Sequence, residues 1–224
     1  KSEWPAFYCQ YSNSTTKFIN CFISDNVNDG AAGKGAGIAV MNGANLILEN
    51  TVFERNEGNK GAAIYVSGKV EITDCSFSDN TAGENGGAIY LDTYSGCNLS
   101  VTNTVFHGNE ADERGGAVYV DDNSRANIGY STLNGNHSDN NGGAICVIGS
   151  ARLYMFRSSF IGNYGASGGA IYTDSGTNGN YADLFIDECS FDANYITDRW
   201  GTTMNINGID HFCMHNSSIR GSYN

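Results

Sequence analysis

Tyrosine precedes aspartate by two residues at three equivalent places in this sequence. The pairs are Tyr90 and Asp92, Tyr119 and Asp121, and Tyr172 and Asp174, and Tyr65 precedes Ser67 at an equivalent place. On a β-strand, residues two apart project from the same face. An exposed aromatic ring beside carboxylates suits a sugar, because the ring face takes C–H contacts while the acids bind hydroxyls or a calcium ion. These residues are therefore candidates for a glycan-binding Tyr/Asp face; we expect no cofactor, with calcium as the one candidate. The alternative is that stacked tyrosines only stabilise a sheet.

The same residues include the best group of carboxylates for catalysis. Asp121 and Asp122 are adjacent, Asp92 lies in the preceding repeat, and Arg125 is the nearest base. Polysaccharide hydrolases need clustered acids, and lyases also need a Lys or Arg base. The strands carry none of the histidines or arginines expected beside such acids. We therefore expect no enzyme and no catalytic residue, and keep a polysaccharide lyase or glycoside hydrolase acting at the Tyr/Asp face as an alternative.

A third group with chemical potential is the segment "HFCMH", in which His211, Cys213 and His215 occupy alternate positions. On a strand these residues share an outward face, but the two histidines stand about 13 Å apart. Zinc ligands must converge on one ion. We therefore interpret them as scattered surface residues and predict no metal site.

The charge and composition exclude several classes of partner. The chain has 224 residues, with 12 Lys and Arg against 24 Asp and Glu, and this excess of acids repels nucleic-acid phosphates. It contains no run of 18 apolar residues and no amphipathic helix with a basic face, so we expect no membrane insertion by this segment. Glycine is abundant, at 29 residues, and proline occurs once, which indicates many tight turns between regular strands.

Two tetrapeptide motifs alternate along the chain. The first is Phe-x-x-Asn, which starts at Phe53, Phe77, Phe106, Phe160 and Phe191, with degenerate copies at Ile23, Leu133 and Ile219. The second is Gly-Gly-Ala-Ile or Gly-Gly-Ala-Val, which starts at Gly86, Gly115, Gly142 and Gly168, with variants at Gly35 and Gly61. The spacing from Ile23 to Ile219 gives a mean period of about 28 residues, within the range of solenoid repeats.

Within one period the apolar residues alternate, which indicates short strands. In the repeat around Ile89, the alternation slips by one residue between Val101 and Thr104, which marks a corner. Three short strands per period, each unable to bury its inner face alone, predict a parallel β-helix. Equivalent residues then stack along the axis at about 4.8 Å.

This stacking predicts two structural ladders. One is an internal column of Phe53, Phe77, Phe106, Phe160 and Phe191, completed by Ile23, Leu133 and Ile219. The other is a turn ladder, in which each asparagine bonds to the next coil; it consists of Asn26, Asn56, Asn80, Asn109, Asn136, Asn163 and Asn194. The glycine pairs allow unusual dihedral angles and close contact between coils.

In these alternating motifs the chain resembles the polymorphic outer membrane protein repeats of chlamydial-type and adhesin-like surface proteins. The resemblance runs from Ile23 through nearly the whole chain. It implies a right-handed single-stranded parallel β-helix displayed outside the cell, often as an autotransporter passenger with adhesive roles. We therefore predict an all-β solenoid of about eight coils with three short strands each. It forms a single domain over 1–224, with 1–17 as an N-terminal cap or lead-in and 18–224 as the repeat coils.

The seven cysteines and the glycosylation sequons receive separate interpretations. Cys21, Cys75 and Cys189 stand two residues before the Phe column, where small residues recur, and are expected to be buried free thiols. Cys9, Cys97, Cys146 and Cys213 are free to pair or react, and an extracellular location favours one bridge among them. Sequons occur at Asn13, Asn98, Asn136 and Asn216.

The prediction for function is a non-enzymatic extracellular or cell-surface protein. It would present a repetitive face to a glycan or to a host or environmental surface receptor. The final segment "HNSSIRGSYN" is still inside the repeat pattern. We expect either a longer passenger or, as an alternative, an extracellular filament subunit that stacks end to end with copies of itself.

Overall fold

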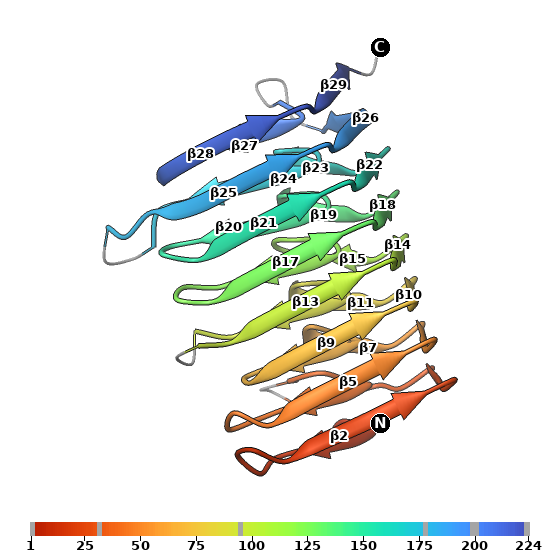
Figure 1. The fold of residues 1–224 in the computed structure, drawn as a ribbon. Helices are drawn as coiled ribbons and strands as arrows, with labels where there is room; N and C mark the ends of the chain where they lie inside the picture. Colours follow the sequence, from red (N-terminus) through yellow and green to blue (C-terminus); the bar gives the residue numbers. More distant parts are fainter. Residues whose placement is uncertain (1–2, 31–32, 94–95, 177–178, 198–201, 222–224) are drawn as a thin grey trace.

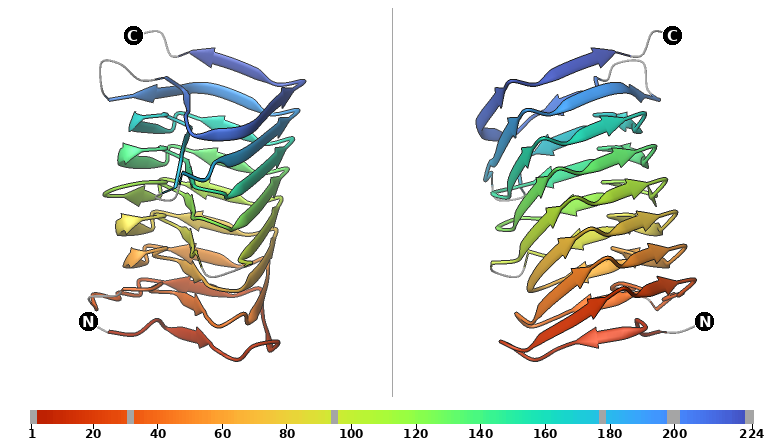
Figure 2. Two further views of the ribbon diagram at one scale, coloured as in Figure 1. Left: turned by 90° about the vertical axis from the view of Figure 1, so that its left-hand side faces the viewer. Right: turned by 45° about the vertical axis from the view of Figure 1, so that its right-hand side comes forward.

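The computed structural model describes residues 3–30, 33–93, 96–176, 179–197 and 202–221. In these ranges every element of regular secondary structure is a β-strand, and all strand pairing is parallel between successive coils (Figure 1). No helix in the described part of the chain is long and apolar enough to cross a membrane. The coils are stacked in chain order, with the two termini at opposite ends (Figure 2).

Three sheets run along the axis. Sheet 1 has eight strands: β1 (Phe7–Cys9), β4 (Ile38–Val40), β8 (Ile64–Val66), β12 (Ile89–Leu91), β16 (Val118–Val120), β20 (Ile145–Ile148), β24 (Ile171–Asp174) and β27 (Met204–Ile206). Sheet 2 also has eight: β2 (Thr15–Ile19), β5 (Asn45–Glu49), β9 (Lys69–Thr73), β13 (Asn98–Thr102), β17 (Arg125–Gly129), β21 (Arg152–Phe156), β25 (Ala182–Asp187) and β28 (Ile209–His215).

Sheet 3 contains the Phe-x-x-Asn motifs and has two halves. The first half comprises β3 (Phe22–Ser24), β6 (Val52–Glu54), β10 (Ser76–Ser78), β14 (Val105–His107), β18 (Thr132–Asn134), β22 (Ser159–Ile161), β26 (Ser190–Ile196) and β29 (Ser218–Gly221). The second half comprises β7 (Glu57–Lys60), β11 (Thr81–Asn85), β15 (Glu110–Ala111), β19 (His137–Asn141) and β23 (Tyr164–Ser167). The predicted all-β parallel solenoid of about eight coils is confirmed, with a fourth short strand added in five of the coils.

The first coil begins earlier than the sequence indicates. Strand β1 pairs with β4, and Thr15 to Ile19 of β2 pair in register with Asn45 to Glu49 of β5. The structure therefore places β1 and most of β2, which lie within the expected cap or lead-in of 1–17, in the first coil. The sequence of β2 hides the alternation, because the polar Thr16 holds a less exposed position and the apolar Ile19 holds an exposed one.

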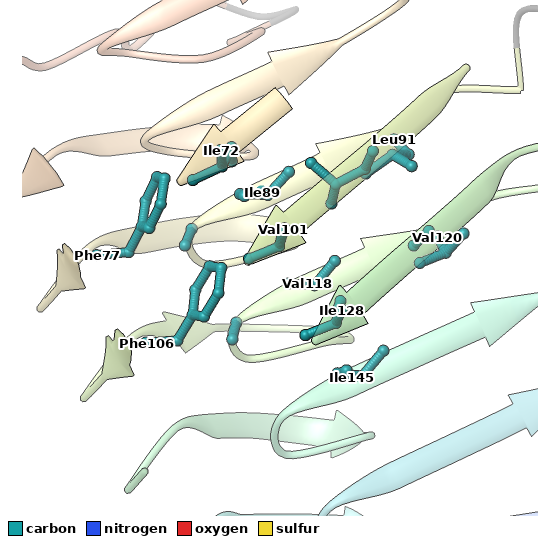
Figure 3. Close-up of a cluster of buried hydrophobic side chains, with 14 of the residues drawn as sticks. Ile72, Phe77, Ile89, Leu91, Val101, Phe106, Val118, Val120, Ile128 and Ile145 are labelled. Atoms are coloured by element: carbon teal, nitrogen blue, oxygen red, sulfur yellow. The ribbon is translucent and has the colours of Figure 1, made fainter. Parts of the chain in front are cut away.

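The interior is a continuous apolar column. The rings of Phe53 and Phe77 stack at 4.8 Å between centroids, and those of Phe77 and Phe106 at 4.9 Å. Figure 3 shows Phe77 and Phe106 side by side, facing the aliphatic residues of sheets 1 and 2. The five phenylalanines and Leu133 of the predicted column are fully buried, which confirms that column. At its ends Ile23 is buried but Ile219 is 48 % exposed.

The asparagine ladder is confirmed in full. In each central coil the side-chain oxygen accepts hydrogen bonds from the backbone and side-chain N–H groups of the preceding asparagine, as Asn109 does for Asn80 at 3.2 and 2.8 Å. The side-chain amide also donates to the carbonyl of Phe77, at 3.0 Å. This pattern gives the buried side-chain oxygen and amide of each central asparagine a hydrogen-bond partner, so the ladder stabilises the fold.

The corners depend on left-handed backbone conformations. Asn103, at the slip between Val101 and Thr104, has a φ of 50°. Gly86 has a φ of 68°, and a Cβ added at Gly87 would lie 2.1 Å from the carbonyl oxygen of Gly116. The glycine pair therefore supplies both the unusual dihedral angle and the close contact that the sequence predicts.

The residues two before the Phe column form a third ladder. Hydroxyl and thiol groups there accept hydrogen bonds from backbone N–H groups of the preceding coil, as when Thr51 N–H donates to Cys75 Sγ at 3.4 Å and Cys75 N–H to Thr104 Oγ1 at 3.3 Å. Cys75 and Cys189 are buried free thiols, and Cys21 is half-buried. Among the described residues, none of Cys9, Cys97, Cys146 and Cys213 forms a disulfide, so the bridge expected among them is not formed in this structure.

Candidate binding surfaces

The predicted Tyr/Asp residues do form columns on the outer side of sheet 1. Tyr65, Tyr90 and Tyr119 lie in register on β8, β12 and β16, and Cys146 and Tyr172 continue the column on β20 and β24. The ring centroids of Tyr65 and Tyr90 are 5.5 Å apart, and those of Tyr90 and Tyr119 are 5.0 Å apart. We call this column the tyrosine ladder.

The tyrosine ladder is buried, so the expectation of exposed rings is wrong. Only 1 % of Tyr65, 5 % of Tyr90 and 6 % of Tyr119 is exposed. The ammonium groups of Lys34 and Lys60 lie over the rings of Tyr65 and Tyr90, at 4.7 and 5.5 Å from the centroids. These residues immediately precede the glycine motifs, so the turn that re-enters sheet 1 carries the cations that cover the ladder. Sugar rings therefore have no open face on which to stack at Tyr65, Tyr90 or Tyr119, whereas Tyr172 at the end of the ladder is half-buried.

The aspartates of the predicted face are engaged in local hydrogen bonds. Tyr90 donates to Asp121 Oδ2 at 2.7 Å, and the other carboxylate oxygen, Oδ1, accepts the N–H of Asp122 at 2.9 Å. Asp92 has the same arrangement with the hydroxyl of Tyr65 and the N–H of Thr93.

Asp174 repeats this pattern in the seventh coil. It accepts from Tyr172 at 3.2 Å and from the N–H of Ser175 at 2.8 Å. With one oxygen bound to a tyrosine and the other to the backbone, these carboxylates are poorly disposed to share a calcium ion, which needs several oxygen ligands at one point.

Burial dominates the electrostatics of the ladder. It raises the pKa of Tyr65 and Tyr90 far above the usual range, and the neighbouring carboxylates Asp92 and Asp121 raise it further. The pKa of Tyr119 is also raised by burial and by Asp121, while Arg114 opposes this effect through a hydrogen bond. The tyrosines are therefore held as neutral hydrogen-bond donors.

The residues of the alternative catalytic group have three separate sets of partners. Asp122 Oδ1 accepts the N–H of Ser150 at 2.8 Å and its hydroxyl at 2.6 Å. Arg125 points along sheet 2, where its guanidinium lies 6.0 Å from the ring centroid of Tyr154. The structure therefore brings Asp121 to a tyrosine, Asp122 to a turn and Arg125 to another sheet.

An open aromatic surface lies elsewhere, on the outer face of sheet 2 in the last three coils. Tyr154 and Phe185 stack at 4.7 Å with an interplanar angle of 5°. They line a groove of about 360 Å³ together with Met155, Phe156, Ile186, Asp187, Cys213 and His215. Phe156 is 37 % exposed, and its ring lies across Gly129 of the preceding coil, where a Cβ would meet it at 2.0 Å. We call this surface the aromatic groove.

Charged side chains surround the aromatic groove. Arg152 Nε lies 3.0 Å from Asp183 Oδ2, and His211 Nδ1 lies 2.8 Å from Asp183 Oδ1. The hydrogen bond to Asp183 raises the pKa of the exposed His211. His215 Nδ1 contacts Asp187 at 3.3 Å. This rim offers both hydrogen-bond donors and acceptors beside the rings.

His211, Cys213 and His215 are all exposed on β28, as their alternate positions predict. The predictions from the sequence do not include the aromatic groove beside them. Its signal in the sequence is the position that Tyr154, Phe185 and Cys213 share between two inward residues of successive repeats. This signal is visible only when the outward positions of the second strand of each repeat, and not only those of the first, are compared.

The four sequons differ in accessibility. Asn13 and Asn216 are exposed and Asn98 is half-buried. Asn136 is fully buried in the asparagine ladder, where its side-chain amide donates to Phe106 O at 3.1 Å and to Asn163 Oδ1 at 2.9 Å. A glycan on Asn136 would remove that donor and would not fit in the turn, so this sequon is not a site for modification of the folded chain.

Comparison with known proteins agrees with this architecture. No curated protein and no solved structure matches the chain. The family model described as the right-handed β-helix region matches residues 6–185, which is most of the chain and includes the first coil. With its parallel coils, internal ladders and family match, the chain belongs to the right-handed β-helix family.

Proposed function

We propose that the chain is a non-enzymatic extracellular or cell-surface protein that binds glycans through the aromatic groove. The observation that carries this proposal is the stacked pair of Tyr154 and Phe185 at an open surface. Because Tyr154 and Phe185 stack on each other, they present their ring edges, which together with the exposed ring of Phe156 form an apolar surface for the C–H groups of a sugar. The charged rim of Asp187 and His215 can bind the hydroxyls of the sugar.

The architecture supports adhesion more than catalysis. The stack of coils provides a rigid sheet on which side chains are held at fixed spacing, and the groove extends over three adjacent coils. The carboxylates first considered for catalysis accept hydrogen bonds from tyrosines and backbone groups. A rigid surface of this kind suits weak contacts repeated along a chain of sugars, because linked contacts add up to firm attachment.

A glycan array with the isolated chain tests the proposal. The test variant is Tyr154→Ala with Phe185→Ala, and the matched control is Glu71→Ala with Ser100→Ala, which alters the same outward column in earlier coils. We expect the test variant to lose at least about tenfold in affinity for any glycan bound, and the control to keep it. Urea unfolding of both variants establishes that the fold is intact.

Three results would overturn the proposal. The first is glycan binding that survives loss of both rings in the folded double variant, and the second is an array with no binding at all. The third is turnover: release of reducing ends or unsaturated sugars from pectin, alginate or glycosaminoglycans, abolished by Asp121→Asn, would establish an enzyme acting at the Tyr/Asp face.

A further inference from the structure

Four outward side chains meet on the second half of sheet 3, away from both surfaces described above. Glu110 of β15 pairs with His137 of β19, so the two lie side by side on adjacent coils. Asp139 follows two residues after His137 on the same face, and Asp112 holds the same position relative to Glu110. Three carboxylates and one imidazole therefore occupy neighbouring positions on two coils.

The imidazole of His137 lies between two of these carboxylates. Its Nδ1 is 3.4 Å from Glu110 Oε1, and its Nε2 is 3.4 Å from Asp139 Oδ1. One ligand atom from each of the three residues can be chosen so that all lie within 4.8 Å of one another. Small side-chain rotations would bring such atoms to the spacing found around a tetrahedral ion with bonds of about 2.0 to 2.2 Å.

The ring of His137 is held in position from the next coil. It stacks on Tyr164 at 4.2 Å between centroids, and Tyr164 stacks on Tyr195 at 5.0 Å. Only 19 % of the His137 side chain is exposed. A ligand that is already oriented loses less conformational entropy when it binds a metal.

Negative charge is concentrated at this point. Asp112 lies close enough to Asp139 and Glu110 to be repelled by both. Among the residues that the structure describes, the ion pairs of Glu110 and Asp139 are made with His137, which carries charge only when it is protonated. A divalent cation carries two positive charges, so it would relieve this repulsion more fully than the imidazole alone does.

From this geometry we propose that Glu110, His137 and Asp139 bind a divalent transition-metal ion of the zinc type. The imidazole selects against calcium and magnesium, which prefer oxygen ligands alone, and favours zinc and related ions. Water, or the nearby carboxylate of Asp112, would complete the coordination. The site is independent of the glycan function proposed above.

The chain contains a built-in comparison for this site. A second group, Asp183, Asp210 and His211, also has ligand atoms within 4.8 Å of one another. Its histidine side chain is 67 % exposed, and its Nδ1 lies 2.8 Å from Asp183. The packed imidazole distinguishes the Glu110 site, so we expect zinc to bind there first.

Titration calorimetry with zinc chloride, after dialysis against a chelator, tests the proposal. The variants are His137→Gln and the pair Glu110→Gln with Asp139→Asn, and the controls are His211→Gln and the exposed His107→Gln. We expect one saturable site in the wild type, a loss of at least about tenfold in affinity in both test variants, and little change in both controls. Cobalt(II) added in place of zinc should give visible absorption that depends on His137.

The opposite results are equally definite. Wild-type zinc binding that is absent up to millimolar metal, or that is unchanged in folded His137→Gln, overturns the proposal. Binding that disappears in His211→Gln instead would assign the metal to the last coil. The substituted side chains face outward, so we expect the variants to remain folded. Unfolding curves recorded without metal check that no general loss of structure has occurred.

Discussion

The Phe column lies inside the β-helix and the tyrosine ladder lies outside it, although both are stacks of aromatic rings. The Phe column packs against aliphatic residues from all three sheets. The tyrosine ladder has the other face of sheet 1 behind it and is covered by Lys34, Lys60 and Arg114 and by aspartates. Except at Ile219 and Tyr172 near their ends, both ladders are almost inaccessible to solvent, yet only the first is enclosed by backbone on every side.

This difference shows that burial in a solenoid has two sources. Inside, neighbouring strands exclude water because each coil closes on itself. Outside, long side chains from the adjacent turn cover the rings and keep their charged ends in water, as lysine and arginine commonly do. The outer ladder therefore adds hydrophobic stabilisation to a face that the fold alone leaves open, but its cover can move without disrupting a coil.

The largest expected effect of this difference is on stability. Phe106→Ala should lower the free energy of unfolding by about 3 to 5 kcal/mol, because it leaves a cavity that stacked coils cannot close. Tyr119→Ala should cost about 2 to 3 kcal/mol, because its flexible cover can collapse into part of the space. The exposed Tyr181→Ala should stay within about 0.5 kcal/mol of the wild type.

Urea unfolding followed by circular dichroism measures all three variants. A loss for Tyr119→Ala as small as that for Tyr181→Ala would contradict the burial of the outer ladder. A loss as large as that for Phe106→Ala would show that the side-chain cover is as rigid as the core.

The burial of the Phe column could be predicted from the sequence, and the burial of the tyrosine ladder could not. Alternating apolar residues and the slip before Thr104 determine which side chains face inward, and the structure confirms this register at Phe77 and Phe106. No such periodicity describes what lies over Tyr90, because its cover comes from the polar, glycine-rich segment around Lys60. Its composition is typical of a loop, although Lys60 is the last residue of the short strand β7.

Alternation shows which side chains face outward but not what covers them, and this also limited the prediction of the candidate sites. Outward positions could be assigned from alternation, as the exposed His211 and Cys213 show. Whether an outward residue is open depends on side chains from the next coil and from the adjacent turn, and these contacts are not encoded in a strand pattern. Asn136 carries a sequon by sequence, but its role in the turn ladder makes it inaccessible.

The second prediction uses alkaline pH to distinguish the ladders. Burial raises the pKa of Tyr90 in the folded chain, so the folded state holds its proton more tightly than the unfolded state does. The stabilisation is present below the unfolded tyrosine pKa of about 10 and is lost as pH rises above it. Wild-type stability should therefore fall between pH 9.5 and 11, by up to about 1.4 kcal/mol per pH unit for each such group.

Tyr90→Phe removes the ionisable group but keeps the stacked ring. At neutral pH it should cost about 1 kcal/mol, because Asp121 loses a hydrogen-bond donor. Above pH 10 the variant should lose stability less steeply than the wild type. Equal slopes in urea unfolding at several pH values would show that Tyr90 ionises freely. The exposed Tyr181→Phe is the control, and its slope should match that of the wild type.

The smallest expected effect is a change in labelling rate at Cys146, which occupies one position of the tyrosine ladder. Burial raises the pKa of its thiol, and Arg114 close to it opposes that shift. In the native chain a thiol reagent should label exposed Cys213 first, half-buried Cys21 more slowly, and the buried cysteines only through local opening of the structure.

Arg114→Ala removes part of the side-chain cover without altering a coil. We expect it to raise the labelling rate of Cys146 by about tenfold, because local opening of the cover costs less than unfolding. The rate at Cys75, which is enclosed in the inner column, should not change. Mass spectrometry of peptides from partly labelled protein resolves the sites. Equal acceleration at Cys75 and Cys146 would mean that the two ladders open together, and the distinction between a core closed by backbone and a ladder covered by side chains would then be lost.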